Sequence, residues 1–404
     1  MWIDQILEKS SSIYSFQQDE ELKLIKRTID IALHRKDKYT VGIKLAALYD
    51  LVISAEYYTS VTNTNWLYCR HKDISRLILP FTNCCPIHAL DGQFVFHVSH
   101  KPTSAKIGQA TTRVLLFFYQ ELFKALGKNI EVMKAVEPAD AIFIDRETNK
   151  VLFAEIKSSP LLTLSLSTKC DVLRSYDKHD NIINIEHKKS DNTNLIGMPI
   201  SIMLPVKDKK KWRMKEYVLG IKKNIEDKSF AYMGLFNLLQ DEEFITNYLY
   251  YWDKSFKAYC NKNDAENIFW LTNACGKPSN LANWGGGTTC ISDEKTSVGM
   301  DRTDDIKKGI YQVLKLGSEG KKEDGDKYDY LVGLLSNIHP ARHFDMYLEP
   351  IKDLIWTICK DKNVRYAKDL PRNAKLYNLF DGIITFTYSY LRNPWLKKEL
   401  SILK

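Results

Sequence analysis

Three side chains that together can hold a metal ion and activate water stand within residues 137–159, EPADAIFIDRETNKVLFAEIKSS. Asp140 and Glu155 are carboxylates, and Lys157 follows Glu155 by two positions. Mg²⁺ prefers oxygen ligands such as carboxylates and keeps several of its waters. An ion held in this way can activate a water molecule and orient a phosphodiester, and a nearby ammonium group stabilises charge in the transition state. These residue types are therefore typical of metal-assisted phosphodiester hydrolysis.

The segment that carries these side chains has the pattern of a β-hairpin. Apolar runs at residues 141–144 and 151–154 flank a polar turn, as expected for two antiparallel strands joined by a loop of several residues. Residues i and i+2 of a strand point to the same face, so Glu155 and Lys157 should project together. Asp140 stands at the start of the partner strand, where the register decides whether it reaches Glu155. The alternative interpretation is an ordinary amphipathic hairpin with solvated charges.

At these positions the chain resembles the PD-(D/E)xK nuclease superfamily, and type II restriction endonucleases in particular. The pattern of that family is Pro-Asp or Pro-x-Asp, a spacer, and then Asp/Glu-x-Lys, which corresponds here to Pro138, Asp140, Glu155 and Lys157. The resemblance implies that Asp140 and Glu155 bind Mg²⁺ and that the main-chain carbonyl of Ile156 adds a ligand. It also implies that Lys157 assists the attacking water.

The resemblance extends over roughly residues 105–165 and includes a helix immediately before the hairpin, which often carries another acidic residue toward the site. Residues 107–127 have the apolar periodicity of such a helix, and Gly127 is a typical C-terminal signal. Glu121 is the only carboxylate in this segment, so it is the candidate fourth catalytic residue. A solvated surface glutamate is the alternative.

The rest of the chain predicts an α/β fold in which a restriction-endonuclease-like core, a mixed central β-sheet flanked by helices, follows a helical N-terminal region and contains a large insertion. Apolar periodicity predicts helices at 242–259, 302–317 and 344–359, and strands at 198–205, 216–221 and 328–338. We expect a mainly helical N-terminal region at 1–104, a nuclease core at 105–164 and 289–360, an insertion at 165–288 and a C-terminal helical segment at 361–404.

The predicted insertion contains a basic cluster around an aromatic residue. Lys209, Lys210 and Lys211 precede Trp212, and Arg213 follows it. Such a cluster can contact the phosphates of nucleic acid, although a solvated turn between strands is the alternative. In restriction enzymes, insertions of this kind usually carry base readout, so the insertion is the candidate DNA-recognition region.

Two further sets of residues leave alternatives open. Asp293 and Lys295 also fit an Asp-x-Lys pattern, but no Pro-Asp hairpin precedes them. A structural Zn²⁺ site is the second possibility, because a Cys-x-His pair is followed by a Cys-x-x-His pair. Buried thiols and surface histidines are the alternative explanation for that set, which consists of Cys69, His71, Cys85 and His88.

Composition sets limits without deciding the function. A chain of 404 residues can bury one large core or several smaller ones. The net charge of +8 fits an anionic partner. No apolar run of about 18 residues and no secretory leader is present, so we expect a cytoplasmic protein without membrane segments, whose eight cysteines stay reduced. No Walker motif occurs, which argues against a nucleotide cofactor.

Taken together, these features predict a Mg²⁺-dependent, sequence-specific double-stranded DNA endonuclease of the type II restriction class. Two-fold symmetry would let a homodimer cut both strands, with one site in each subunit. A structure-directed or modification-directed nuclease of the same fold is one alternative. The other is a non-catalytic DNA-binding protein in which the Glu-x-Lys pattern is incidental.

Overall fold

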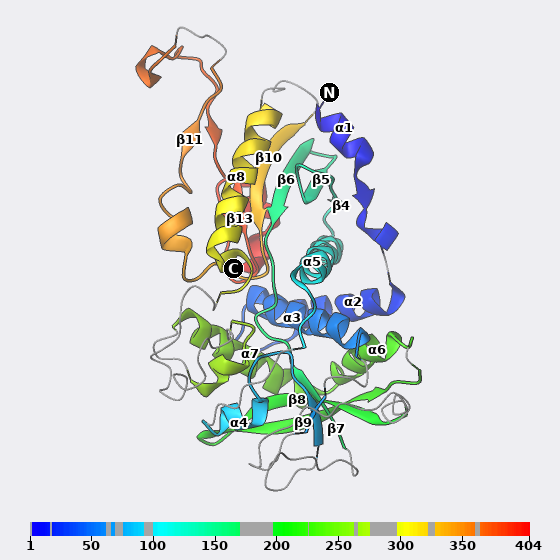
Figure 1. Cartoon of the computed structure of the whole chain (residues 1–404). Helices are drawn as coiled ribbons and strands as arrows, with labels where there is room; N and C mark the ends of the chain where they lie inside the picture. Colours follow the sequence, from blue (N-terminus) through cyan, green and yellow to red (C-terminus); the bar gives the residue numbers. More distant parts are fainter. Residues whose placement is uncertain are drawn as a thin grey trace.

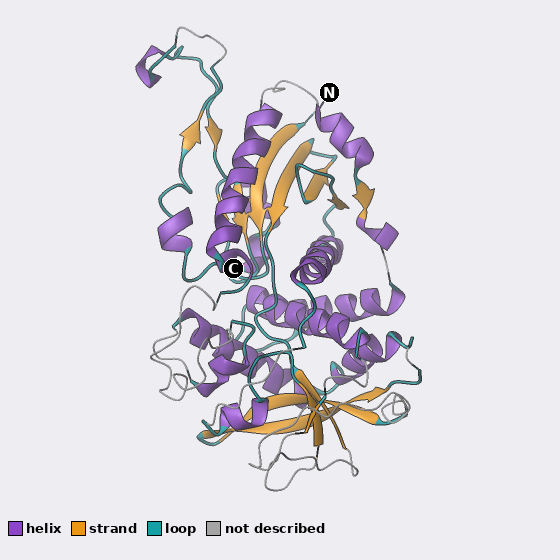
Figure 2. Cartoon of the chain, in the orientation of Figure 1, coloured by secondary structure: helices purple, strands orange, loops and turns teal. Residues whose placement is uncertain are grey.

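The computed structural model describes residues 2–16, 18–61, 66–68, 76–92, 100–169, 197–224, 226–261, 266–274, 297–321, 328–359 and 364–404. Within these residues the chain is a mixed α/β protein with a seven-stranded mixed sheet at one end and a five-stranded sheet at the other (Figure 1). Helices fill the space between the two sheets (Figure 2). No helix in these ranges is long and apolar enough to cross a membrane.

The larger sheet places the candidate catalytic hairpin near its centre. Its first strands run antiparallel to one another, and its later strands β6, β10 and β13 run parallel. The strand order is β1 (Ser11–Ser12), β4 (Ile130–Lys134), β5 (Ala141–Asp145), β6 (Lys150–Ile156), β10 (Asp329–Leu335), β13 (Gly382–Ile384) and β14 (Tyr390–Leu391).

Two long helices, α5 (Ser104–Ala125) and α8 (Thr303–Gly320), cover opposite faces of this sheet. On β5, Phe143 packs in the same cluster as the apolar residues of α5, while Ile142 packs with those of α8. Because successive strand residues alternate between faces, every residue of β5 is buried. The strand is therefore apolar from Ala141 to Ile144, as strands covered on both sides are.

The helical layer between the sheets centres on α3, which is buried on nearly all sides. Apart from Lys44, Asp50 and Glu56, apolar residues lie around most of this helix, as expected for a helix inside a core. The other helices are α1 (Trp2–Lys9), α2 (Asp19–His34), α4 (Pro86–Leu90), α6 (Ser229–Leu238), α7 (Glu242–Cys260) and α9 (Pro394–Glu399), with α3 spanning Val41–Thr59.

The smaller sheet is antiparallel and joins two distant parts of the chain. Its order is β2 (Leu67–Tyr68), β3 (Arg76–Leu79), β7 (Ser165–Lys169), β8 (Pro199–Asp208) and β9 (Lys211–Ile221). The N-terminal region is therefore not helical throughout, because it contributes β2 and β3 to this sheet, and β3 pairs with β7 of the predicted insertion. Local sequence does not reveal this arrangement, since the pairing joins segments almost one hundred residues apart.

Several predicted elements are confirmed, including α5, α7, α8 and the strands β8, β9 and β10. The C-terminal region differs from the prediction. It forms β12 (Tyr377–Asn378), β13 and β14, and α9 is its one α-helix among the described residues. Residues 344–359 form a five-residue π-helix, Phe344–Leu348, and then β11 (Ile355–Trp356). Pro350 prevents a continuous helix there, and pairing with β10 makes Gly382–Ile384 a buried strand.

Candidate active site

Antiparallel pairing of β5 with β6 brings Asp140 to the end of β6. Ala141 is opposite Ala154, and the Asp140 N–H donates to the Ala154 carbonyl at 3.1 Å. The Asp140 carboxylate also accepts a hydrogen bond from the Ile156 N–H, with 2.9 Å between Oδ2 and N. The register that the sequence left open therefore places Asp140 beside Glu155 and Ile156.

Strand alternation then sets which side chains share a face. Ile156 belongs to the apolar cluster on the α5 side, so Glu155 and Lys157 face α8, as the i, i+2 rule predicts. On α8, Gly309 lies against Lys157, because a Cβ on this glycine would be 3.9 Å from Lys157 Cγ. The tighter neighbour of Gly309 is Leu334 of β10, whose Cδ2 would lie 3.0 Å from that Cβ.

The two carboxylates and the lysine form one tightly coupled group. Lys157 Nζ donates to the Glu155 carboxylate, and Glu155 is 6% exposed. The pKa of Glu155 is raised to about 7, chiefly by burial and also by the negative charge of Asp140, while Lys157 opposes both effects. Two acids thus share one cation in a partly desolvated place. Such a site disfavours a second negative charge and favours an added cation.

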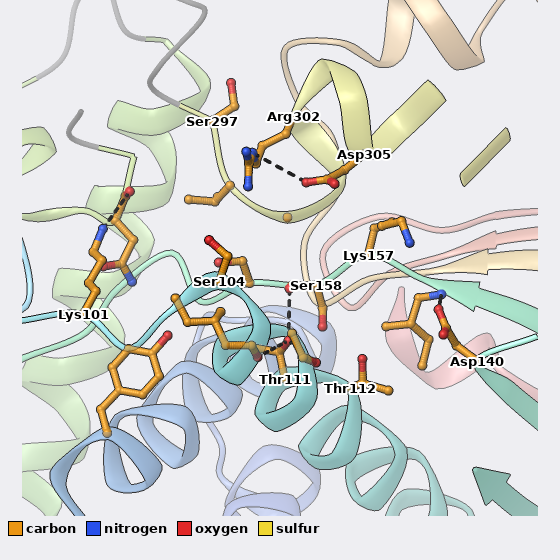
Figure 3. A pocket seen from close by; sticks show the side chains of 18 residues that line it. Lys101, Ser104, Thr111, Thr112, Asp140, Lys157, Ser158, Ser297, Arg302 and Asp305 are labelled. Atoms are coloured by element: carbon orange, nitrogen blue, oxygen red, sulfur yellow. Dashed lines mark hydrogen bonds and ion pairs between the residues drawn. The ribbon is translucent and has the colours of Figure 1, made fainter. Parts of the chain in front are cut away.

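Asp140, Ile156 and Lys157 border an open cavity of about 680 Å³. Asp140 and Lys157 lie at one end of it and Lys101 at the other, with Arg302 and Asp305 along one side (Figure 3). The remaining polar lining comes from the start of α5, the segment after β6 and two further loops, namely Ser104, Thr111, Thr112, Ser158, Ser159, Asn273 and Ser297.

The first turns of α5 and α8 both border the cavity. Their N-cap residues, Thr103 and Arg302, make no side-chain capping hydrogen bond. The first N–H groups of a helix carry partial positive charge, which attracts anions. Arg302 adds a full positive charge, although Asp305 lies 3.5 Å from its Nε. The wall opposite Asp140 and Glu155 is therefore suited to phosphate.

The segment that follows Lys157 is held by hydrogen bonds from several elements. The Lys157 N–H donates to Leu335 of β10 at 3.0 Å, and Thr111 Oγ1 donates to the Ser158 carbonyl at 3.2 Å. The side chain of Asn337 both accepts from the Ser159 N–H, at 3.2 Å, and donates to its carbonyl, at 2.8 Å. The main chain beside the lysine is consequently fixed relative to both α5 and β10.

Asp50 of α3 holds the next part of the same segment. Its Oδ2 accepts from the N–H groups of Leu161 and Leu162, each at 3.0 Å, and from Trp252 Nε1 of α7 at 2.7 Å. The pKa of Asp50 is raised to about 8, because the effect of burial outweighs that of these donors, which lower the pKa. Sequence reasoning missed Asp50, although an acid within the apolar run at 45–53 is a signal that it has buried partners.

Glu121 does not join Asp140 and Glu155. It is buried among other partners, accepting a hydrogen bond from the Tyr14 hydroxyl and lying 3.9 Å from Lys26 and 3.5 Å from Lys124. Along α5 it is ten positions beyond Thr111, which corresponds to about 15 Å at 1.5 Å per residue. Glu121 therefore does not line the cavity, and it is not a solvated surface glutamate either.

The predicted basic cluster lies at the tip of the β8–β9 hairpin, away from the cavity wall. Lys209 and Lys210 form the turn, with Lys211 next to it, and all three are exposed. Arg213 pairs with Asp208 at 3.2 Å. Contact of this hairpin with DNA stays a prediction.

The two other candidate sets fall partly or wholly outside the described residues. Asp293 and Lys295 lie outside them, as do Cys69 and His71. Cys85 is buried and hydrogen-bonded to His88, which raises the pKa of the imidazole. The described ranges contain no cluster of three or more His, Cys, Asp or Glu side chains able to hold a metal. The Asp140–Glu155 site has two such side chains, and Ile156 also lines it.

Comparisons of the chain with protein-family models, with curated proteins and with solved structures give no match.

Proposed function

We propose that this chain is a Mg²⁺-dependent endonuclease that hydrolyses double-stranded DNA at specific sequences, as type II restriction enzymes do. The observation that carries the proposal is the β5–β6 pairing, which sets Asp140 against Glu155 and Ile156 with Lys157 on the same face. The order of elements supports it as well. A helix precedes the three antiparallel strands, and a second helix leads to a parallel fourth strand, which together resemble a restriction-endonuclease core.

The residues present suit a hard divalent cation. Asp140, Glu155 and the Ile156 carbonyl would supply oxygen ligands, and the cavity has room for the waters that Mg²⁺ retains. Burial and the charge of Asp140 raise the pKa of Glu155, and a bound cation would offset both by stabilising the charged carboxylate. When bound, Mg²⁺ supplies an acidified water and stabilises negative charge on the phosphodiester.

The protein's own groups would orient the reaction. The hydrogen bond from the Ile156 N–H holds Asp140 in one position. Lys157 carries a positive charge at the mouth of the cavity, where it can donate hydrogen bonds to the attacking water or to a phosphate oxygen. Arg302 and the starts of α5 and α8 would face the DNA backbone from the other wall.

The test is cleavage of long double-stranded DNA by the purified protein with Mg²⁺ or with EDTA. We expect discrete fragments in Mg²⁺ alone, and no cleavage by Asp140→Asn, Glu155→Gln or Lys157→Ala. Glu147→Gln is the matched control, because Glu147 is an exposed acid in the turn of the same hairpin. Each inactive variant should still shift DNA in a gel, since none of them removes the basic wall of the cavity.

Each other outcome separates the alternatives. A smear of fragments would indicate a structure-directed or non-specific nuclease. Cleavage restricted to modified or branched DNA would indicate a nuclease directed to those substrates. Near-normal cutting by any of the three variants would show that the catalytic residues are assigned incorrectly. DNA binding without any cleavage under all these conditions would favour the non-catalytic alternative.

A further inference from the structure

A two-stranded arm stands out from the protein beside α8 and extends past the C-terminal end of that helix (Figure 1, orange). We define the arm as residues 353–359 and 364–378. At its base, β11 and β12 pair antiparallel, with Ile355 opposite Asn378 and Trp356 opposite Tyr377. A two-stranded ribbon is marginally stable by itself, so the base needs support from the rest of the protein.

Trp356 supplies this support. Its indole lies against Gly317 of α8, where a Cβ would come within 3.1 Å of Cζ2. Trp356 Nε1 donates to the Asn378 carbonyl at 3.2 Å, and its ring lies 5.4 Å from that of Tyr377. The base of the arm is therefore attached to the helix whose first turn borders the candidate active site.

Beyond the base, the described part of the arm is strongly basic. Its four basic residues are all exposed, whereas Asp369 is the one acid between residues 364 and 378. Arg365 and Arg372 make no ion pair within the described residues, and Lys368 lies over the ring of Tyr366 at 5.5 Å. The basic residues are Arg365, Lys368, Arg372 and Lys375.

The β8–β9 hairpin is only partly similar. There Lys207, Arg213 and Lys215 each have an acidic partner, at 3.4, 3.2 and 2.5 Å, and only the lysines at its tip are exposed without one in the described part of the chain. Unpaired arginines on a projecting ribbon repel one another, and a polyanion relieves that repulsion. Exposed tyrosines such as Tyr366, 66% exposed, can also donate hydrogen bonds to phosphates.

The geometry of α8 sets the distance between the arm and the cavity. Arg302, at the start of α8, lines the cavity, and Gly317 contacts the base of the arm. Fifteen helical positions separate them, which corresponds to about 22 Å. Because the arm extends past the C-terminal end of α8 (Figure 1), its basic residues lie farther than this from the candidate active site.

We propose that the arm binds the phosphate backbone of duplex DNA at a distance of more than about 22 Å from the scissile bond. The inference rests on the proposed function for the identity of the polyanion, since the arm itself recognises only a phosphate backbone. Its contacts add affinity without base specificity, because phosphates carry no sequence information. The arm would thereby lengthen the stretch of DNA that the protein occupies.

The experiment measures binding to random-sequence duplexes of about 6 base pairs, closed by a loop, and of about 40 base pairs in EDTA, by fluorescence anisotropy over a range of salt concentrations. The shorter duplex is about 20 Å long and cannot span both sites, whereas the longer one can. The arm variant is Arg365→Gln/Arg372→Gln. The control is Lys23→Gln/Lys36→Gln, which removes the same charge from two exposed lysines in and after α2. Unfolding temperatures should match the wild type, because all four residues are exposed.

We expect the arm variant to bind the long duplex about tenfold more weakly or worse, and its slope of log K against log salt to fall by about 2. Its affinity for the short duplex should match that of the wild type, and the control should bind both as the wild type does. An arm variant that keeps the full affinity and salt slope on the long duplex would overturn the inference.

Two further results separate the possible failures. If the arm variant alters the oligomeric state in analytical ultracentrifugation while binding the long duplex normally, the arm joins copies of this chain and the inference is wrong. If no DNA is ever cleaved but the length-dependent loss is seen, the proposed nuclease function fails while the arm is still shown to bind DNA.

Discussion

Replacing Glu155 with glutamine should make the metal-free protein more stable at alkaline pH while abolishing its proposed activity. The folded-state pKa of Glu155 is raised from 4.5 to about 7, because burial and Asp140 disfavour its charged form. A raised folded-state pKa contributes stability that is fully present below the unfolded value, 4.5, and is lost as the pH rises through about 7. Glutamine has no charge to lose, so the variant avoids this loss.

The structure sets the size of the effect. Each pH unit of pKa change corresponds to 1.36 kcal/mol, so the rise from 4.5 to about 7 corresponds to about 3 kcal/mol. The ion pair with Lys157 is already part of this balance, and a glutamine carbonyl can still accept its hydrogen bond. Relative to the variant, the wild type should therefore lose up to about 3 kcal/mol of stability between pH 4.5 and pH 8.5.

The assay is urea unfolding of both proteins at the two pH values in EDTA. Titrating groups away from Asp140 and Lys157 are common to the two proteins, so their contributions cancel in the difference. Glu147→Gln serves as the control, because Glu147 is exposed and its replacement should give no pH-dependent difference. Adding Mg²⁺ at one hundred times its Kd should stabilise the wild type by about 2.7 kcal/mol and the variant much less.

Two results would refute this reasoning. A wild-type-to-variant difference that stays the same from pH 4.5 to pH 8.5 would show that Glu155 has an ordinary pKa. A variant that is less stable than the wild type at pH 8.5 would show that the charged carboxylate of Glu155 stabilises the metal-free fold.

Three other changes test the surroundings of the site. Lys157→Met keeps the aliphatic stem but removes the ammonium, so single-turnover cleavage should fall by about 10² to 10³ while DNA affinity in a mobility shift changes little. Trp252→Phe removes a donor to the buried carboxylate of Asp50 and should lower the urea-unfolding free energy by about 1–3 kcal/mol. Gly299 has a φ of 54°, so Gly299→Ala should cost about 1 kcal/mol or more. Gly108→Ala, in open space on α5, should instead stabilise by about 1 kcal/mol.

Sequence reasoning succeeded where a local rule determines the outcome. The two-residue period of a strand places Glu155 and Lys157 on one face, whatever the rest of the fold does. Gly127 ends α5 because a positive φ, here 63°, costs glycine little. The same rules predicted β8, β9 and α8 close to their observed positions.

Sequence reasoning failed where an element forms only because it pairs with its neighbours in the sheet. β13 has three residues, Gly382–Ile384, too few to show any periodicity, and pairing with β10 makes it a strand. Gly382 is opposite Gly333 in that pairing, and a Cβ on Gly333 would come within 2.5 Å of the Gly382 carbonyl oxygen. The close approach of these two strands is a property of the assembled sheet that neither segment expresses alone.

By itself the sequence determined which residue types could perform the chemistry, because the spacing of Asp140, Glu155 and Lys157 and the hairpin pattern around them are local properties. Tertiary structure alone decided that Asp140 reaches Glu155, through the β5–β6 register, and that Glu121 lies elsewhere with Tyr14. It also decided that Asp50 holds the segment beyond the lysine. Strand register, helix packing and buried hydrogen bonds each join residues far apart in the chain, and the free energies that select them arise only when those residues are desolvated together.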